Sequence, residues 1–115
     1  REGGEELGAV GVVHRAIRRH LVVERGPNLG ARFLLDHDVT TAGRSTHSDI
    51  FLNDITVSRH HVKFIRRDGK VFVEDQSSLN GTYVNKERID QAALRTGDEV
   101  QIGKFRLVYY ASSAS

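Results

Sequence analysis

The sequence predicts an all-β protein folded as a β-sandwich, and three observations carry this prediction. Short runs of apolar and β-branched residues alternate with polar ones from Leu21 onward. Turn-forming pairs recur between these runs, at Asp68-Gly69, Asn80-Gly81 and Gly97-Asp98. No helical period of about ten or more residues follows Leu21. Many short strands with polar turns favour two packed sheets.

The segments can be assigned in chain order. Residues 1–20 carry only a weak amphipathic pattern and are expected to form a flexible basic tail. The folded domain is expected over residues 21–110, and its first turn is Gly26-Pro27-Asn28. Residues 111–115 have nothing to bury and are expected to be disordered.

Alternation within the domain predicts which side chains share a face. Such sets should meet in one core, because alternate residues of a strand point to the same side. The sets are Phe33 with Leu35, Val62 with Phe64, Val71 with Val73, and Phe105 with Leu107 and Tyr109.

The composition limits the class of protein. With 115 residues the chain has room for one domain and short tails. It contains no cysteine, which removes disulfides and thiolate metal sites. Neither a signal peptide nor an apolar stretch of about 20 residues is present, so a cytoplasmic protein is expected. Because the chain begins at Arg1 and not at methionine, we also expect a fragment of a longer protein.

The net charge of +2 does not by itself indicate a nucleic-acid partner. Basic and acidic residues nearly balance from Leu21 onward, and the basic cluster lies upstream at Arg15, Arg18 and Arg19. Such a run could touch a phosphate backbone or a membrane, but it is more often a solvated tail. We therefore expect a monomer that binds neither nucleic acid nor membrane.

Three short motifs fall in expected loops and could bind an anion together. In the first, Gly43 lets the chain bend and present Arg44, whose guanidinium can donate two parallel hydrogen bonds to phosphate. In the second, Ser58-Arg59-His60-His61, a hydroxyl donor lies beside another cation. Each motif alone is also consistent with ordinary surface loops.

The second motif has two other interpretations. His60 and His61 could suggest a metal site, but adjacent residues of a strand point to opposite faces, and no metal or cofactor is expected. Ser58 and His61 could form a nucleophile and its base, but no Gly-x-Ser-x-Gly elbow accompanies them. We expect instead that the ring nitrogens of His61 hold backbone groups and fix Ser58.

The third motif is Ser78-Leu79-Asn80-Gly81-Thr82. An Asn-Gly pair between apolar residues is a strong hairpin signal, so a tight turn is expected at Asn80-Gly81. The asparagine amide offers donors and an acceptor, which suits it to hold an extended peptide that passes over the loop.

The order and spacing of these motifs resemble the signature of the forkhead-associated (FHA) domain. The likeness continues through Thr82-Tyr83-Val84-Asn85 and Gly97-Asp98-Glu99-Val100-Gln101-Ile102-Gly103, and it covers nearly all of residues 21–110. The resemblance implies an FHA-type β-sandwich of two twisted, mainly antiparallel sheets with binding loops at one end. It also implies a module that binds phosphothreonine peptides and is not an enzyme.

Carried over by matching positions, the resemblance implies a role for each motif residue. Arg44, Ser58 and Arg59 would contact the phosphate, and Asn80 would hold the peptide after the phosphothreonine. Leu79 stands where other FHA domains place a threonine, so only its backbone could line the pocket. The resemblance adds Ser78 to the binding residues and makes Gly43, His61 and Gly81 structural supports of the loops.

Four further segments look like an actinobacterial subfamily, the glycogen accumulation regulator and the oxoglutarate dehydrogenase inhibitor. They are Arg25-Gly26-Pro27-Asn28, Phe33-Leu34-Leu35-Asp36, Ser48-Asp49-Ile50-Phe51-Leu52 and Gly103-Lys104-Phe105-Arg106-Leu107-Val108. This resemblance implies phosphothreonine proteins, serine/threonine protein kinases, 2-oxoglutarate dehydrogenase and glutamate enzymes as partners. The alternative is an adaptor domain of a larger signalling protein unrelated to central metabolism.

A regulatory feature of that subfamily is not expected here. In the subfamily, a phosphorylated threonine of the N-terminal tail lets the tail occupy the domain. Residues 1–20 contain no serine, threonine or tyrosine. The tail present in this chain therefore cannot act as that switch.

Overall fold

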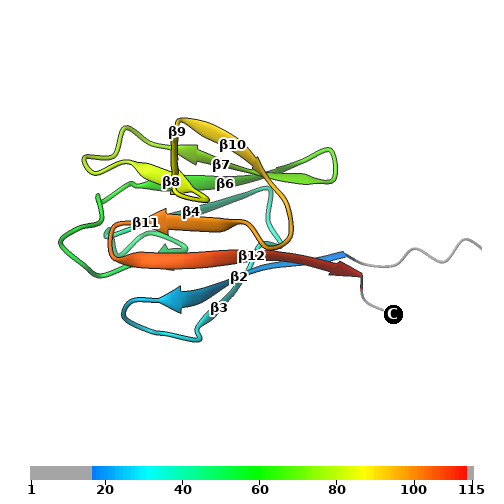
Figure 1. Cartoon of the computed structure of the whole chain (residues 1–115), viewed down its shortest axis with the longest axis horizontal. Coiled ribbons are helices and arrows are strands. Elements are labelled where there is room, and N and C mark those ends of the chain that lie inside the picture. The colour runs from blue at the N-terminus through cyan, green and yellow to red at the C-terminus, as the bar shows by residue number, and fades with distance from the viewer. Residues whose placement is uncertain (1–16, 114–115) are drawn as a thin grey trace, which may run out of the picture.

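The computed structural model describes residues 17–113 and shows two β-sheets packed face to face (Figure 1). All the elements of this range are strands, so the predicted all-β sandwich is confirmed. No helix in this range is long and apolar enough to cross a membrane. In chain order the strands are β2 (Ile17–Arg25), β3 (Arg32–Leu34), β4 (Val39–Gly43), β5 (Ile50–Phe51), β6 (Val62–Arg67), β7 (Lys70–Asp75), β8 (Thr82–Val84), β9 (Glu87–Ile89), β10 (Gln91–Leu94), β11 (Glu99–Ile102) and β12 (Phe105–Ser113).

The strands form one sheet of five and one of six. The order is β10-β7-β6-β4-β5 in the first sheet and β3-β2-β12-β11-β8-β9 in the second. Pairing is antiparallel except between β4 and β5, which run parallel where Ala42 faces Ile50. This agrees with the expected pair of mainly antiparallel sheets.

The core lies between the sheets and contains the faces that alternation predicted. Val62, Phe64, Val71 and Val73 come from the five-stranded sheet and are buried against the side chains of the six-stranded sheet. The buried partners from β12 are Phe105, Leu107 and Tyr109, while Leu35 is buried and Phe33 is partly buried beside them. The alternation of apolar and polar residues predicted these faces, because each sheet packs one side against the core and exposes the other to solvent.

Two strands extend into segments that the sequence analysis assigned to tails. β2 begins at Ile17, and β12 continues to Ser113, which pairs with Ile17. Residues 17–20 and 111–113 therefore belong to the sheet, because each supplies hydrogen-bond partners for the other. The rest of the two expected tails, residues 1–16 and 114–115, lies outside the described residues.

The expected tight turns divide into hairpins and crossovers. Asp68-Gly69 joins β6 to β7 as a two-residue hairpin, with positive φ at both residues. Asn80-Gly81 is not a hairpin, which corrects the prediction, because it lies in the loop between β7 and β8 of different sheets. The nearby hairpin is Asn85-Lys86, between β8 and β9, with φ of 50° and 71°. Gly97-Asp98 also joins the two sheets.

Candidate functional site

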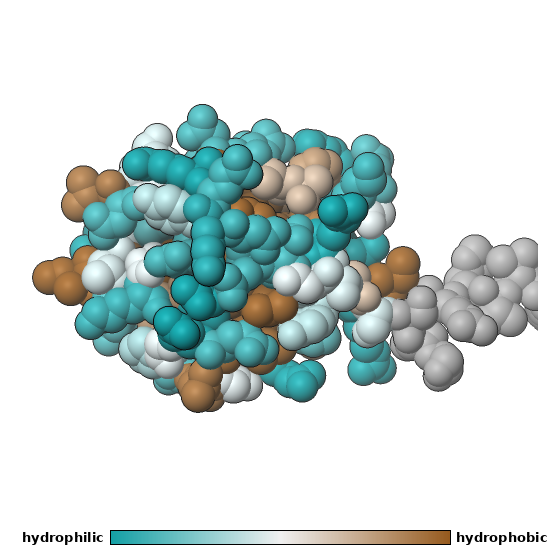
Figure 2. All heavy atoms as spheres, in the orientation of Figure 1, coloured by the Kyte–Doolittle hydropathy of each residue, from teal (hydrophilic) through white to brown (hydrophobic). Residues whose placement is uncertain are grey.

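Three loops gather at the end of the sandwich that is on the left of Figure 1. They are residues 44–49 after β4, residues 52–61 before β6, and residues 76–81 after β7. These loops carry the three motifs that the sequence singled out. Large apolar side chains are also exposed on them, with Ile55 at 88% and Leu79 at 86% exposure, and Figure 2 shows apolar side chains protruding at this end.

Gly43 allows two of these loops to pack backbone against backbone. A Cβ added at Gly43 would lie 2.1 Å from the carbonyl oxygen of Arg59 and 3.0 Å from that of Ser58. The next two amides use this proximity, because Arg44 N donates to Ser58 O at 2.9 Å and Ser45 N donates to Arg59 O at 3.1 Å. The absence of a side chain at residue 43 is therefore what brings the first and second motifs together.

Arg44 is exposed but not loosely placed. Its Nε donates to the carbonyl oxygen of Val57 at 3.0 Å, which fixes the direction of the guanidinium. The terminal nitrogens of the guanidinium stay available for a ligand, and a planar fork of this kind suits a phosphate. Arg59 is also exposed, and its carbonyl is held by the bond from Ser45. Both cations thus come from backbone that is fixed.

His61 ties the second loop to the third. It is fully buried, its Nδ1 accepts the Ser58 amide at 3.0 Å, and its Nε2 lies 2.9 Å from the Gly81 carbonyl oxygen. These partners require the tautomer with the proton on Nε2. Burial lowers the pKa of His61, against the opposing effects of the Gly81 carbonyl and the Asp75 charge. The ring is therefore neutral, and neither nitrogen faces the Ser58 hydroxyl.

Ser58 links the two loops at the centre of the site. Its Oγ accepts a hydrogen bond from the backbone amide of Leu79 at 2.9 Å. No described residue accepts the hydroxyl proton of Ser58, which is partly exposed. Leu79 meets the second loop through this backbone amide, while its side chain is exposed.

Ser78 lies differently from the other predicted binding residues. It is buried, its hydroxyl donates to a carboxylate oxygen of Asp75, and it accepts the Gly81 amide at 3.0 Å. Thr82 donates to the same Asp75 oxygen at 2.6 Å. Burial alone would raise the pKa of Asp75, but the bonds from Ser78 and Thr82 bring it below its usual value. The geometry groups Ser78 with His61 and Gly81 as a support of the loop.

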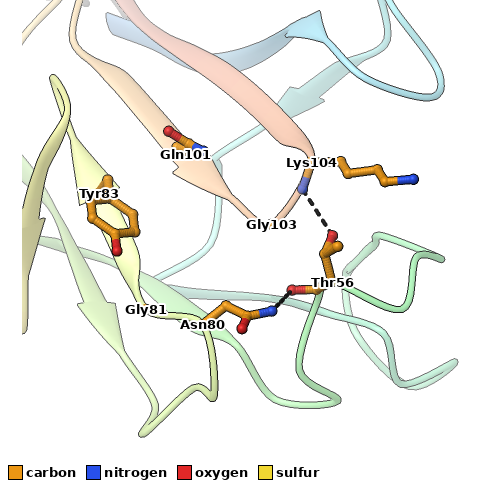
Figure 3. Close-up of a pocket in the computed structure, with 7 residues that line it drawn as sticks. All are labelled: Thr56, Asn80, Gly81, Tyr83, Gln101, Gly103 and Lys104. Carbon is orange, nitrogen blue, oxygen red and sulfur yellow. Dashed lines mark hydrogen bonds between the residues drawn. The ribbon is translucent and has the colours of Figure 1, made fainter.

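Asn80 borders a pocket that sequence reasoning missed (Figure 3). Its Nδ2 donates to the Thr56 carbonyl oxygen at 2.9 Å, and the Thr56 hydroxyl accepts the Lys104 amide at 2.9 Å. The pocket has a volume of about 230 Å³. Its lining comes from the second and third loops, from β8 and β11 of the six-stranded sheet and from the β11–β12 turn: Thr56, Asn80, Gly81, Tyr83, Gln101, Gly103 and Lys104.

Two side chains fix the loop segment that forms one wall of this pocket. Asp54 accepts the Thr56 amide at 2.9 Å and also its hydroxyl, and Lys104 lies 3.7 Å from Asp54. The bonds from Thr56 lower the pKa of Asp54, and the Lys104 charge contributes. In the local sequence, only the Asp-x-Thr spacing, which is typical of a turn capped by a side chain, could have indicated this segment. The contact with Lys104 joins the sheets and has no signature in the sequence.

Comparison with known proteins agrees with the fold and the loops. A family profile described as the FHA domain matches residues 40–103. The chain is 61% identical over 95 residues to the oxoglutarate dehydrogenase inhibitor of Corynebacterium efficiens, covering 83% of this chain and 67% of that protein. It is 60% identical over 95 residues to the glycogen accumulation regulator GarA of Mycolicibacterium smegmatis, covering 83% of this chain and 60% of the relative.

A solved structure shows the same architecture. It comes from a structural and functional study of phosphothreonine-dependent FHA domain interactions and superposes with a TM-score of 0.75 at 25% identity, covering 81% of this chain and 95% of that one. The family profile spans the loops that carry Arg44, Ser58 and Asn80. The chain therefore belongs to the FHA domain family.

Proposed function

We propose that this FHA domain binds phosphothreonine peptides, with Arg44, Ser58 and Arg59 as the phosphate contacts. The Ser58 hydroxyl carries the proposal. Because its oxygen accepts the Leu79 amide, its proton points away from that amide and has no acceptor among the described residues. A hydroxyl held in this way is a prepared donor for a phosphate oxygen.

The charges at the site favour the phosphorylated form of threonine. A phosphothreonine carries about −1.5 to −2 charges near pH 7 and three acceptor oxygens. Arg44 and Arg59 can make charge-assisted bonds to these oxygens, each stabilising by about 1.5 to 3 kcal/mol. Plain threonine offers no such acceptor. Phosphorylation of the partner therefore determines whether binding occurs.

The peptide that follows the phosphothreonine should pass Asn80. One amide hydrogen of Asn80 is used by Thr56, which leaves the other hydrogen and the side-chain oxygen for a peptide backbone. The pocket beyond Asn80 can then take a side chain of the peptide, with Tyr83 and Lys104 as polar contacts. Peptide specificity would arise there.

The test compares matched peptides that contain threonine or phosphothreonine, measured by calorimetry. We expect binding only of the phosphorylated peptide, and a loss of about tenfold or more in Ser58→Ala, since one charge-assisted bond is removed. Ser112→Ala removes an exposed hydroxyl from β12 and should bind like the parent. Equal binding of both peptides by the parent domain would reject the proposal.

We also infer that the target is an enzyme of 2-oxoglutarate or glutamate metabolism. The support is the 61% identity to a protein named oxoglutarate dehydrogenase inhibitor. The chain covers 67% of that relative and 60% of the regulator GarA. The target of those whole proteins is therefore a proposal for this chain. An assay of 2-oxoglutarate dehydrogenase with added domain should show inhibition. Unchanged activity at micromolar domain would favour the adaptor alternative.

No catalytic role is included in this function. Both ring nitrogens of His61 bond to backbone, so it cannot act as base for Ser58 without breaking the support of the loop. Regulation of a metabolic enzyme would place the protein in the cytoplasm, consistent with the absence of cysteine. Turnover of a generic ester that is lost in Ser58→Ala would contradict the non-enzymatic assignment.

A further inference from the structure

A row of basic and polar side chains crosses the outer face of the six-stranded sheet. The register of β9, β8, β11, β12 and β2 aligns directly opposed residues. Val84, Val100 and Leu107 are buried in the core, so the adjacent Tyr83, Gln101 and Arg106 point to the outer face. Arg88 and Arg25, at the two ends of the row, are exposed. We name it the basic row, and it consists of Arg88, Tyr83, Gln101, Arg106 and Arg25.

Two arginines of the basic row pair across neighbouring strands, which is unfavourable without an anion. Arg106 pairs with Arg25 across β12 and β2 at a β-bulge, where the register passes over Glu24, and like charges at opposed positions destabilise a sheet. Glu99 offsets one of them, with 3.5 Å between its Oε1 and the Arg106 Nε. Within residues 17–113, no acidic side chain lies within ion-pair distance of Arg25 or Arg88. Arg25 and Arg88 are therefore the cations of the row that pair with no acidic side chain of residues 17–113.

The basic row is continuous with the pocket at the binding loops. Tyr83 and Gln101 belong to the row and also line the pocket beside Asn80. Arg88 lies against the third loop, because a Cβ at Gly81 would meet its Nε at 2.8 Å. Figure 2 shows strongly hydrophilic side chains running across the strands on the visible face. A peptide that leaves the pocket can therefore continue along the row.

We propose that the basic row binds an acidic segment that follows the phosphothreonine in the partner protein. This inference rests on the phosphopeptide function proposed above and extends it. Neighbouring strands are about 4.8 Å apart, so the row spans roughly 19 Å from β9 to β2. An extended chain advances about 3.3 Å per residue, and about six residues would cover it. Carboxylates on such a segment would bridge Arg106 and Arg25 and relieve their repulsion.

The test uses two phosphothreonine peptides that differ only in the eight residues after the phosphothreonine. One has glutamates at alternate positions of this tail, and the other has glutamines there. At low salt we expect the glutamate peptide to bind about five to ten times more tightly, since two exposed ion pairs contribute modestly. The advantage should shrink as salt rises to 0.3 M, because exposed charges are screened.

The variants assign this advantage to the row. In the double variant Arg25→Gln, Arg106→Gln, the two peptides should bind within twofold of each other. Arg95→Gln is the matched control, because Arg95 is exposed in the loop between β10 and β11 and outside the row. Glu99→Gln frees Arg106 and should increase the preference for glutamate.

The outcomes separate this inference from the function on which it rests. If both phosphopeptides bind the parent domain equally, or if the double variant keeps the full preference, the basic row is not the acidic site. If the unphosphorylated glutamate peptide binds as tightly as the phosphorylated one, the phosphothreonine function fails instead. Thermal unfolding of each variant checks that these surface changes leave the fold intact.

Discussion

At the scale of single residues, the site depends on its supporting residues as much as on its cations. Gly43 contributes no side chain, His61 is enclosed, and Ser78 turns its hydroxyl inward. These residues hold the backbone from which Arg44 and Ser58 reach solvent. Changes at the supports should therefore affect binding without removing any contact to the ligand.

Gly43→Ala should weaken both folding and binding. The added methyl would lie within 3.0 Å of two carbonyl oxygens of the second loop, so the loop must move away. We expect a loss of about 1 to 3 kcal/mol in the free energy of unfolding and at least a tenfold weaker phosphopeptide affinity. Urea unfolding and calorimetry measure the two effects.

Gly69→Ala is the control for this substitution. Gly69 has a positive φ of 76°, but nothing lies within 4 Å of an added Cβ, and the residue is in the β6–β7 hairpin. It should lose stability only, with unchanged affinity. If Gly43→Ala also kept full affinity, the close contact with Arg59 would not be needed to form the site.

His61 should make the domain less stable in mild acid. Burial lowers its pKa in the folded state below the ordinary value of 6.5. Between that value and the lower folded pKa, the unfolded chain binds a proton that the folded chain excludes. The free energy of unfolding should be constant above about pH 7.5 and fall below about pH 6.5, by up to 1.4 kcal/mol per pH unit.

Urea unfolding at pH 7.5, 6.5 and 5.5 measures this slope. His61→Gln keeps an amide that can bond to backbone but cannot titrate, so its slope over this range should be smaller than that of the parent, even if it is less stable throughout. The lowered pKa values of Asp54 and Asp75 act only in stronger acid, because both lie below 3.8. Parallel slopes for parent and variant would show that His61 is not the titrating group.

At the scale of elements, the hairpin between β8 and β9 has an unfavourable turn residue. Asn85 and Lys86 both have positive φ, and the two-residue turn of this kind prefers glycine at its second position. Asn85 is supported, because its side chain bonds to Asp98 and Glu99. Lys86 has no such support among the hydrogen bonds of the described residues.

Lys86→Gly should therefore stabilise the domain. Removing the side chain relieves a left-handed conformation that costs about 1 kcal/mol or more, while the unfolded chain gains some entropy. We expect the free energy of unfolding to rise by about 0.5 kcal/mol in urea. Lys70→Gly places the same substitution at the exposed first residue of β7, where φ is not positive, and should lower it by about 0.5 to 1 kcal/mol. A loss in both variants would contradict the strain at Lys86.

At the scale of the whole molecule, the site is assembled from both sheets. The bond from the Lys104 amide to Thr56 and the bond from Asn80 to Thr56 connect the β11–β12 hairpin with the two loops. A ligand that contacts Arg44 and the pocket beside Asn80 would add to these connections. Binding and global stability should therefore be linked.

A saturating phosphopeptide should stabilise the whole domain against heat or urea. A ligand that binds only the folded state, at a free concentration 100 times its dissociation constant, adds about 2.7 kcal/mol to the free energy of unfolding. The unphosphorylated peptide at the same concentration is the control and should have no effect. A shift of the same size with both peptides would mean that the phosphate does not select the folded site.

The sequence by itself determined the fold class, the core faces and the three loops that carry the site. This was possible because alternation along a strand and the chemistry of short motifs are local properties. Phe64 and Leu107 are buried because each lies on the apolar face of its strand, whichever strand is its neighbour. The motifs likewise identified Arg44 and Ser58 as candidate phosphate-binding residues.

Only the tertiary structure decided the properties that depend on distant partners. Residues 17–20 are a strand because β12 continues beside them, and Asn80-Gly81 is a crossover because β7 and β8 lie in different sheets. The pocket beside Thr56 and the alignment of Arg25 with Arg106 arise from strand register. β2 and β12 are far apart in the sequence, so no hairpin turn sets their register, and it depends on how the hydrophobic faces of whole sheets pack.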